Sequence, residues 1–237
     1  MQSSPAIVPG SSTSTFCDRL RESARPIWER QLEHPFLRAL CDGSLPTDVF
    51  SFYIRQDARF LDELAKTFAY AATKTSRQDE MQQFGERLLH TLAVEKVLHH
   101  EYARRFGLTI EEMARTPMAP TNYAYTRHVL YAAATGSLAA LISAILPCAW
   151  IYAEVGLHFT VALGGPPKPD HPYCDWIGTY ASPEFQEVGA WLRARLNERA
   201  AALPEPELAA LEAIFLTSSR YEYMFWDMAW RREAWPV

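Results

Sequence analysis

The sequence has few of the features that mark metal-binding, nucleic-acid-binding or membrane proteins. Its four cysteines, at positions 17, 41, 148 and 174 of 237 residues, form no CxxC pair, so neither a zinc knuckle nor a redox dithiol is indicated. The 23 basic residues are scattered and the formal net charge is −5, unlike the basic footprint of a nucleic-acid-binding protein. The most apolar segment, 138–156, is interrupted by Pro147 and Glu154, so no apolar run is long enough to span a bilayer. We therefore expect a reduced protein with no nucleic-acid or membrane partner.

The first residues do not resemble a secretion signal. The start, MQSSPAIVPGSSTST, lacks a basic region followed by an apolar run, so a cytoplasmic location is expected. Residues 1–14 are rich in Ser, Thr and Pro and are predicted to form a disordered leader. The whole chain is 49% hydrophobic and 13% aromatic, which is enough for residues 15–237 to form a single domain with a substantial core.

Nearly everything after the leader has the apolar spacing of helices, and no alternating pattern of useful length predicts a strand. Glycine and proline mark the breaks, and the segment 164–170 is predicted to link two helices. The fold class is therefore predicted to be all-α. The expected helices lie near 15–32, 35–41, 46–76, 77–106, 110–115, 121–136, 138–163, 182–202 and 205–231.

Three helices place a reactive side chain in the middle of an apolar stripe. Cys148 follows Pro147 and shares a helical face with apolar residues, so its thiol points toward whatever that helix buries. Asp57 lies in the stripe of segment 46–76, and Glu222 lies in the stripe of the C-terminal helix. Burying a free carboxylate is costly, so each acid must be paired, hydrogen-bonded or functional. Together they suggest one pocket that contains a thiol and two carboxylates.

Each of these side chains also has a structural explanation. A free cysteine often packs as a small hydrophobic residue. Either acid alone is explained by a helix cap or by a buried salt bridge, and such pairs perturb carboxylates without doing chemistry. The basic residues available as partners are Arg55, Arg59 and Arg220.

Two other candidate sites lack the pattern that their chemistry requires. Glu95, His99, His100 and Glu101 resemble helical metal ligands, but a di-iron bundle needs a Glu-x-x-His motif on each of two helices. Glu95 and His99 are four residues apart, and no second motif matches them. The serine pair at 218–219 lacks the strand–turn–helix context of a hydrolase nucleophile. No metal site is predicted.

Seven segments along the chain form a recognisable series. In order they are HPF (34–36), DGSLP (42–46), FSFYIRQD (50–57), PTNYAYTRH (120–128), LPCAWIYAEVG (146–156), WIGTY (176–180) and SSRYEYMFWDMAW (218–230). Together they resemble the TenA-type thiaminase II family, whose members are also called aminopyrimidine aminohydrolases. The resemblance covers roughly residues 15–232, and the combination of segments is far more specific than a shared helical fold requires.

The resemblance implies a heme-oxygenase-like helical bundle without heme or other cofactor, usually a homotetramer, acting in thiamin salvage. It implies that Cys148 is the nucleophile, that Glu222 transfers protons and that Asp57 holds the aminopyrimidine. The other substrate-binding positions implied are Phe60, Tyr125, Tyr152, Tyr180 and Phe225. At Phe60 the sequence departs from the family pattern, which has a tyrosine there.

The implied reaction is the hydrolytic removal of the leaving group on the C5 methylene of a 4-aminopyrimidine, either ammonia or the thiazole of thiamin. Covalent addition of a thiolate divides one difficult displacement into easier steps. Two alternatives remain open: a slow or non-catalytic pyrimidine-binding relative, which the residue Phe60 favours, and an oxidative or di-iron relative. The second would need a His/Glu ligand set and has no use for Cys148.

Overall fold

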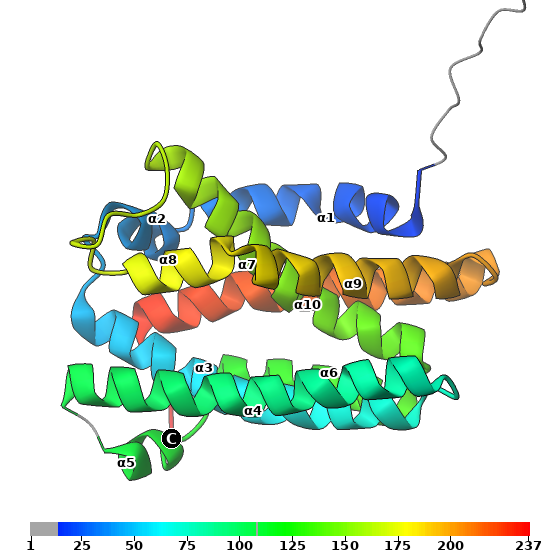
Figure 1. The fold of residues 1–237 in the computed structure, drawn as a ribbon, viewed down its shortest axis with the longest axis horizontal. Coiled ribbons are helices and arrows are strands. Elements are labelled where there is room, and N and C mark those ends of the chain that lie inside the picture. Colours follow the sequence, from blue (N-terminus) through cyan, green and yellow to red (C-terminus); the bar gives the residue numbers. More distant parts are fainter. Residues whose placement is uncertain (1–13, 108) are drawn as a thin grey trace, which may run out of the picture.

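The computed structural model describes residues 14–107 and 109–237, with the side chains at 94–100, 102, 103, 106, 110 and 114 outside the description. The predicted leader therefore lies, up to residue 13, outside the described residues. The described part contains ten helices and no strand, which confirms the all-α prediction (Figure 1). The helices are α1 (Phe16–Leu32), α2 (Pro35–Asp42), α3 (Thr47–Thr73), α4 (Gln78–Phe106), α5 (Ile110–Ala114), α6 (Pro120–Thr135), α7 (Leu138–Ala162), α8 (Cys174–Ala181), α9 (Pro183–Ala200) and α10 (Glu205–Arg231).

Nine of these helices match the predicted ranges within three residues at each end, and α8 was not predicted. Helix α8 has only eight residues, and its N-cap Tyr173 makes no side-chain capping hydrogen bond. It also follows the Gly/Pro-rich segment 164–170, which resembles a plain connection. By contrast, α9 begins just after Ser182, whose hydroxyl accepts a hydrogen bond from the Phe185 amide, and has Pro183 in its first turn.

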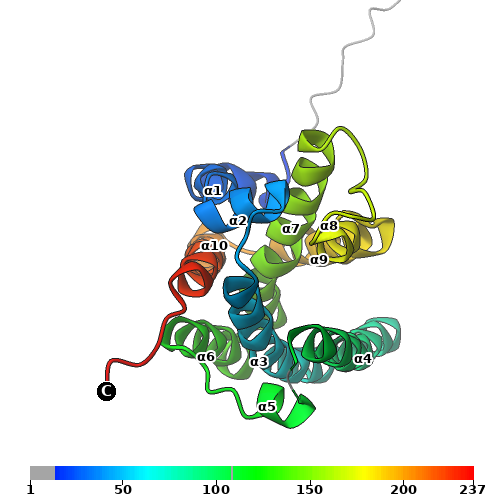
Figure 2. The same ribbon diagram turned by 90° about the vertical axis from the view of Figure 1, so that its left-hand side faces the viewer.

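Helix α7 is the centre of the bundle. It contacts α3, α6, α8, α9 and α10, and Figure 2 shows it between the group α1, α2 and α10 and the pair α8 and α9. Its length and hydropathy would suit a membrane span, but 89% of its most apolar 18-residue window is buried by the other helices. Among the described residues no other helix has this composition and length. Pro147 lies inside α7 without ending it.

The remaining helices pack around α7 and against one another. Helix α3 packs against α4 and α6, while α10 packs against α1, α6 and α7. Helix α4 lies on the far side of α3 from α10 and runs alongside it (Figures 1 and 2). This arrangement leaves the inward faces of α3, α7 and α10 directed toward one shared space.

Candidate active site

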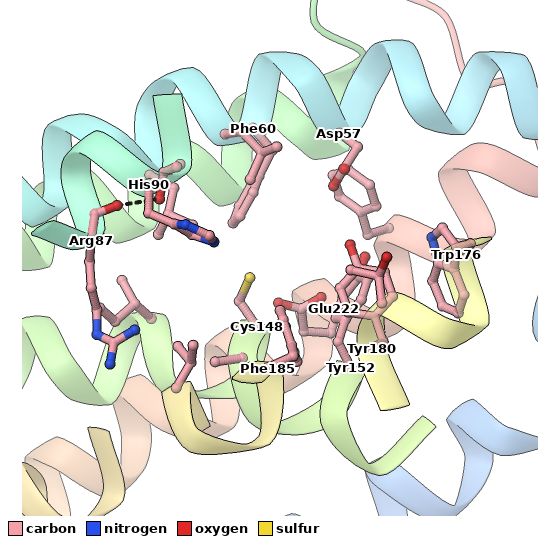
Figure 3. A pocket seen from close by; sticks show the side chains of 18 of the residues that line it. Asp57, Phe60, Arg87, His90, Cys148, Tyr152, Trp176, Tyr180, Phe185 and Glu222 are labelled. Carbon is pink, nitrogen blue, oxygen red and sulfur yellow. Dashed lines mark hydrogen bonds between the residues drawn. The ribbon is translucent and has the colours of Figure 1, made fainter. Parts of the chain in front are cut away.

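A cavity of about 500 Å³ lies between α3, α4, α6, α7, α8, α9 and α10. Its lining is mostly apolar and aromatic, as in small-molecule sites generally. The cavity is lined by all eight residues that the sequence predicts for the site: Asp57, Phe60, Tyr125, Cys148, Tyr152, Tyr180, Glu222 and Phe225. Figure 3 labels six of them, all but Tyr125 and Phe225.

Helical spacing explains why these side chains meet. Residues three or four apart share one face of a helix, so the pairs Asp57–Phe60 on α3, Cys148–Tyr152 on α7 and Glu222–Phe225 on α10 each point the same way. Helices α6 and α8 add one tyrosine each. Five helices distant in sequence therefore contribute these eight residues to a single cavity.

Glu222 is buried and accepts one short hydrogen bond. The Tyr125 hydroxyl donates to Oε1 of Glu222 over 2.6 Å. Burial raises the pKa of Glu222 to about 8, the hydrogen bond from Tyr125 opposes the rise and the charge of Asp57 adds to it. Glu222 therefore keeps a proton near neutral pH, which suits a general acid.

Asp57 is only 7% exposed, and no described residue donates a hydrogen bond to it. Burial raises the pKa of Asp57 to about 7. A buried carboxylate with no partner is costly unless a ligand supplies one. Its oxygen atoms are thus available to a donor that enters the cavity.

The basic residues considered as structural partners for the two acids are engaged elsewhere. Arg59 donates to Asp62 over 2.6 Å, and Arg55 bonds to the Ser51 carbonyl over 3.4 Å. Arg220 is exposed on α10. In the described part of the chain, neither acid forms an ion pair, so a structural salt bridge does not account for either of them.

Cys148 is a free cysteine that is partly exposed, and its sulfur points into the cavity (Figure 3). Burial raises the pKa of Cys148 well above its usual value, and the charges of Glu222 and Asp57 raise it further. The resting side chain is therefore a thiol. It becomes a nucleophile only when a neighbouring group takes its proton as it attacks.

A second row of aromatic residues supports the cavity wall and was not predicted. Nε1 of Trp176 donates to the Tyr53 hydroxyl over 3.3 Å, and that hydroxyl in turn donates to Tyr152 over 3.3 Å. The rings of Tyr152 and Tyr180 lie 4.8 Å apart. Both unpredicted residues belong to segments quoted for the resemblance, FSFYIRQD and WIGTY, and Tyr53 also lies on the inward stripe of α3.

Helix α4 contributes a polar part of the lining that sequence reasoning also missed. Arg87 and His90 lie at one end of the cavity, beyond Cys148 (Figure 3). The Arg87 guanidinium lies over the Trp191 ring at 4.7 Å. No local pattern in α4 marks these residues, because their role depends on how α4 packs against α3 and faces α9.

The candidate metal ligands on α4 fall mostly outside the described side chains. Those of Glu95, His99 and His100 are not described, whereas Glu101 lines the cavity. Among the side chains that are described, no group of three or more His, Cys, Asp or Glu residues is placed to hold a metal ion.

Comparisons with known proteins agree with the resemblance seen in the sequence. The model of the TENA/THI-4/PQQC family matches residues 21–232. The aminopyrimidine aminohydrolase of Halalkalibacterium halodurans is 43% identical over 93% of this chain and 98% of its own.

Solved structures agree as well. A TenA homologue from P. horikoshii OT3 superposes with a TM-score of 0.83 at 30% identity, covering 92% of this chain and 99% of that one. A Shewanella denitrificans domain with a heme oxygenase-like fold has a TM-score of 0.70 at 14% identity, covering 91% and 92%, which supports the predicted fold alone. The chain belongs to the TENA/THI-4/PQQC family.

Proposed function

We propose that the protein is an aminopyrimidine aminohydrolase, a thiaminase II-type hydrolase. It removes the leaving group from the C5 methylene of a 4-aminopyrimidine and forms 4-amino-5-hydroxymethyl-2-methylpyrimidine for thiamin salvage. The observation that supports this most directly is one aromatic cavity that holds a thiol and two buried carboxylates without basic partners. The similarity to the Halalkalibacterium halodurans aminohydrolase supports the same assignment.

Asp57 orients the substrate. An aminopyrimidine has an amino group beside a ring nitrogen, and a carboxylate accepts hydrogen bonds from both when that nitrogen is protonated. The pKa of Asp57, raised by burial to about 7, allows the carboxyl group and the ring to share a proton near neutral pH. The surrounding rings of Phe60, Tyr152 and Phe225 offer flat apolar surfaces to the pyrimidine.

Glu222 and Cys148 perform the covalent steps. The ionised form of Glu222 takes the Cys148 proton as sulfur adds to C6 of the protonated ring. The electrons displaced to C5 then expel the leaving group, which takes the proton from Glu222. Water adds to the exocyclic methylene, giving its proton to Glu222, and the C6–S bond breaks to release the thiolate. The final proton transfer returns Cys148 to the thiol.

The high pKa of Cys148 is compatible with this role. A resting thiol does not react with solutes that enter the empty cavity, because the thiolate is the nucleophile. A bound ring whose nitrogen is protonated adds a positive charge between the carboxylates and the sulfur. That charge favours the thiolate only when substrate is present.

A turnover assay on the full chain tests the function. Product is measured from the aminomethyl and formylamino pyrimidines and from thiamin, because the sequence does not rank these substrates. Cys148→Ser should keep the fold and lose most turnover, while Cys41→Ser, which changes a thiol outside the cavity, should not. Wild-type activity in Cys148→Ser would exclude the covalent mechanism. Binding without turnover in the wild-type protein would instead favour a pyrimidine-binding role.

The assembly is proposed to be a homotetramer in the cytoplasm. The resemblance to the TenA-type family implies this assembly. Of the aromatic residues near the end of the chain, Phe225 and Trp226 are buried within the protomer. Trp230 and Trp235 remain 36% and 52% exposed. Sedimentation that shows only the 27.0 kDa monomer at micromolar concentration would contradict the tetramer.

A further inference from the structure

A chain of polar side chains leads from Glu222 away from the cavity, between α6 and α10. The Tyr125 hydroxyl donates to Glu222 over 2.6 Å. Behind Tyr125, the buried Ser218 hydroxyl lies 3.1 Å from Nε2 of His128. Burial raises the pKa of Tyr125, and a hydrogen bond from Ser218 opposes that rise. Ser218 therefore connects the tyrosine to the histidine.

His128 is the outer end of this chain. It is half-buried, whereas Ser218, Tyr125 and Glu222 are all buried. The Ile214 carbonyl accepts a hydrogen bond from the His128 ring. Because Nε2 faces Ser218, the nitrogen that donates to Ile214 is Nδ1, which leaves Nε2 free to accept or release a proton.

Packing holds the aromatic rings of this series of polar side chains in place. The Tyr221 ring stacks on Tyr125 with centroids 5.2 Å apart and an interplanar angle of 12°. The same ring lies 5.8 Å from the His128 ring. Tyr221 therefore fixes both the inner and the outer members of the chain.

We infer that Ser218 and His128 form a proton relay that connects the buried Glu222 carboxyl group, through Tyr125, to solvent. The inference deepens the proposed function, on which it rests, because Glu222 exchanges one proton with solvent in each turnover. Glu222 holds a proton at rest, must release it before it can take the proton of Cys148, and is ionised again after the last step. Ser218 and His128 do not touch the substrate and are positioning residues. The resemblance to the TenA-type family assigns no role to Ser218 or to His128.

In this relay one proton crosses each hydrogen bond between His128 and Glu222, so the protons balance. Protonated His128 gives its Nε2 proton to the Ser218 oxygen, Ser218 passes its own proton to the Tyr125 oxygen, and Tyr125 passes its proton to Glu222. The products are neutral His128 and protonated Glu222, and each hydroxyl now points outward along the chain. His128 then takes a proton from water, and the Nδ1 bond to Ile214 stays unchanged throughout.

The proton affinities of the two ends favour this direction. Burial lowers the pKa of His128 below its usual 6.5, and the hydrogen bond to Ile214 opposes the change only in part. Burial raises the pKa of Glu222 to about 8. Proton transfer from the His128 imidazolium to Glu222 is therefore favourable in free energy. Transfer in the opposite direction, from Glu222 to His128, needs a base in the solvent that takes the proton from His128.

The first test is kinetic and uses the full chain with the aminomethyl pyrimidine. His128→Ala should lower kcat about tenfold with KM unchanged, less than the roughly 10²–10⁴-fold typical of losing the acid–base group itself. Added imidazole should restore kcat. His158→Ala, which removes an exposed histidine of α7, should have neither effect.

His128→Gln separates a relay from a structural role. The amide keeps a hydrogen-bonding group beside Ser218 but does not exchange protons near neutral pH, so kcat should stay low while the melting temperature matches that of wild type. Full activity in His128→Gln, or a loss in His128→Ala that imidazole does not restore, would overturn the relay. Absence of turnover in the wild-type protein would instead contradict the proposed function.

The second test needs no substrate and follows the Nε2 resonance of His128 by ¹⁵N NMR. Protonated Glu222 directs each hydroxyl outward, so Ser218 donates to His128; ionised Glu222 turns the hydroxyls inward. The resonance should therefore show a second transition with the pKa of Glu222, about 8. It should vanish in Glu222→Gln and in Ser218→Ala. A signal in wild type without that transition would overturn the relay.

Discussion

Gly156 of α7 lies so close to Tyr180 of α8 that a Cβ atom at Gly156 would be 2.4 Å from the Tyr180 carbonyl carbon. The same atom would be 2.6 Å from the amide nitrogen of Ala181. Nearby, the Gln186 side-chain amide donates to the carbonyls of Ala153 and Tyr180, both over 3.0 Å. The absence of a side chain at Gly156 thus allows α8 to place Tyr180 and Trp176 against the cavity.

Gly156→Ala should displace α8 and damage the site. Overpacking against backbone atoms typically costs about 1–3 kcal/mol, which lowers the melting temperature by roughly 2–4 °C per kcal/mol for a chain of this size. We expect kcat/KM to fall more than stability suggests, because Tyr180 moves with the helix. Gly178→Ala, on α8 with no heavy atom within 4 Å of its added Cβ, is the matched control. Equal activity of the two variants would show that Tyr180 is not held by this contact.

Glu222→Gln should reduce catalysis more than binding. Loss of a positioned acid–base group costs about 10²–10⁴-fold in rate, and we expect this loss in kcat. The glutamine oxygen still accepts the hydrogen bond from Tyr125, so the cavity keeps its shape. The affinity for the hydroxymethylpyrimidine product, measured by calorimetry, should change only slightly.

Asp57→Asn should have the opposite effect and reduce binding more than catalysis. An amide cannot accept two hydrogen bonds from the aminopyrimidine edge as a carboxylate does. The lost hydrogen bond to a charged group is worth about 1.5–3 kcal/mol, so product affinity should fall about tenfold to a hundredfold. Equal effects of Asp57→Asn and Glu222→Gln on product affinity would contradict the assigned roles.

The two buried acids should also make the protein less stable as pH rises. Because the pKa of Asp57 is raised from 3.8 to about 7, the folded protein binds a proton that the unfolded chain has lost, and the free energy of unfolding falls across that interval. The full interval corresponds to about 4 kcal/mol. Glu222, raised from 4.5 to about 8, contributes a loss of the same sign.

Asp57→Asn removes its part of this loss. Urea unfolding at about pH 5 and about pH 8 should show a decline in stability that is smaller by about 2–3 kcal/mol in the variant than in wild type. Asp62→Asn, on the same helix but paired with Arg59, should keep the full decline. A decline of the same size in wild type and Asp57→Asn would mean that Asp57 is already ionised at the lower pH.

The site was predictable where one helix defines it. Asp57, Cys148 and Glu222 each lie in an apolar stripe, and helical periodicity alone places them on inward faces. That these faces meet in one cavity does not follow from periodicity, because it depends on how α3, α7 and α10 cross. The segments that resemble the TenA-type family supplied that link.

Contacts between helices could not be predicted from local sequence patterns. Arg55 and Arg59 were candidate partners for Asp57, but Arg59 pairs with Asp62 one turn along the same face of α3. The wall contributed by α4 and the Ser218–His128 contact both join segments far apart in sequence. Helix α8 was missed because eight residues with no side-chain cap give too weak a periodic signal.

At Phe60 the sequence departs from the family pattern, which has a tyrosine there. Phe60 is buried in the cavity wall, with its ring 5.0 Å from Tyr125 and 5.9 Å from Phe225. Its ring points toward Cys148 (Figure 3). A hydroxyl added at the end of this ring would extend toward the sulfur, where it can donate to the thiolate that the reaction forms.

Phe60→Tyr should therefore raise kcat/KM. A hydrogen bond to a charged partner is worth roughly 1.5–3 kcal/mol, or about tenfold to a hundredfold at 1.36 kcal/mol per decade. Because the same bond favours the thiolate form of Cys148 in the free protein, iodoacetamide should also alkylate Cys148 faster at a given pH, measured with Cys148→Ser as the blank. The opposing effect is the cost of burying a phenol that finds no partner. A lower kcat/KM with unchanged alkylation would show that the cavity is shaped around phenylalanine, and would favour a substrate whose leaving group occupies that space.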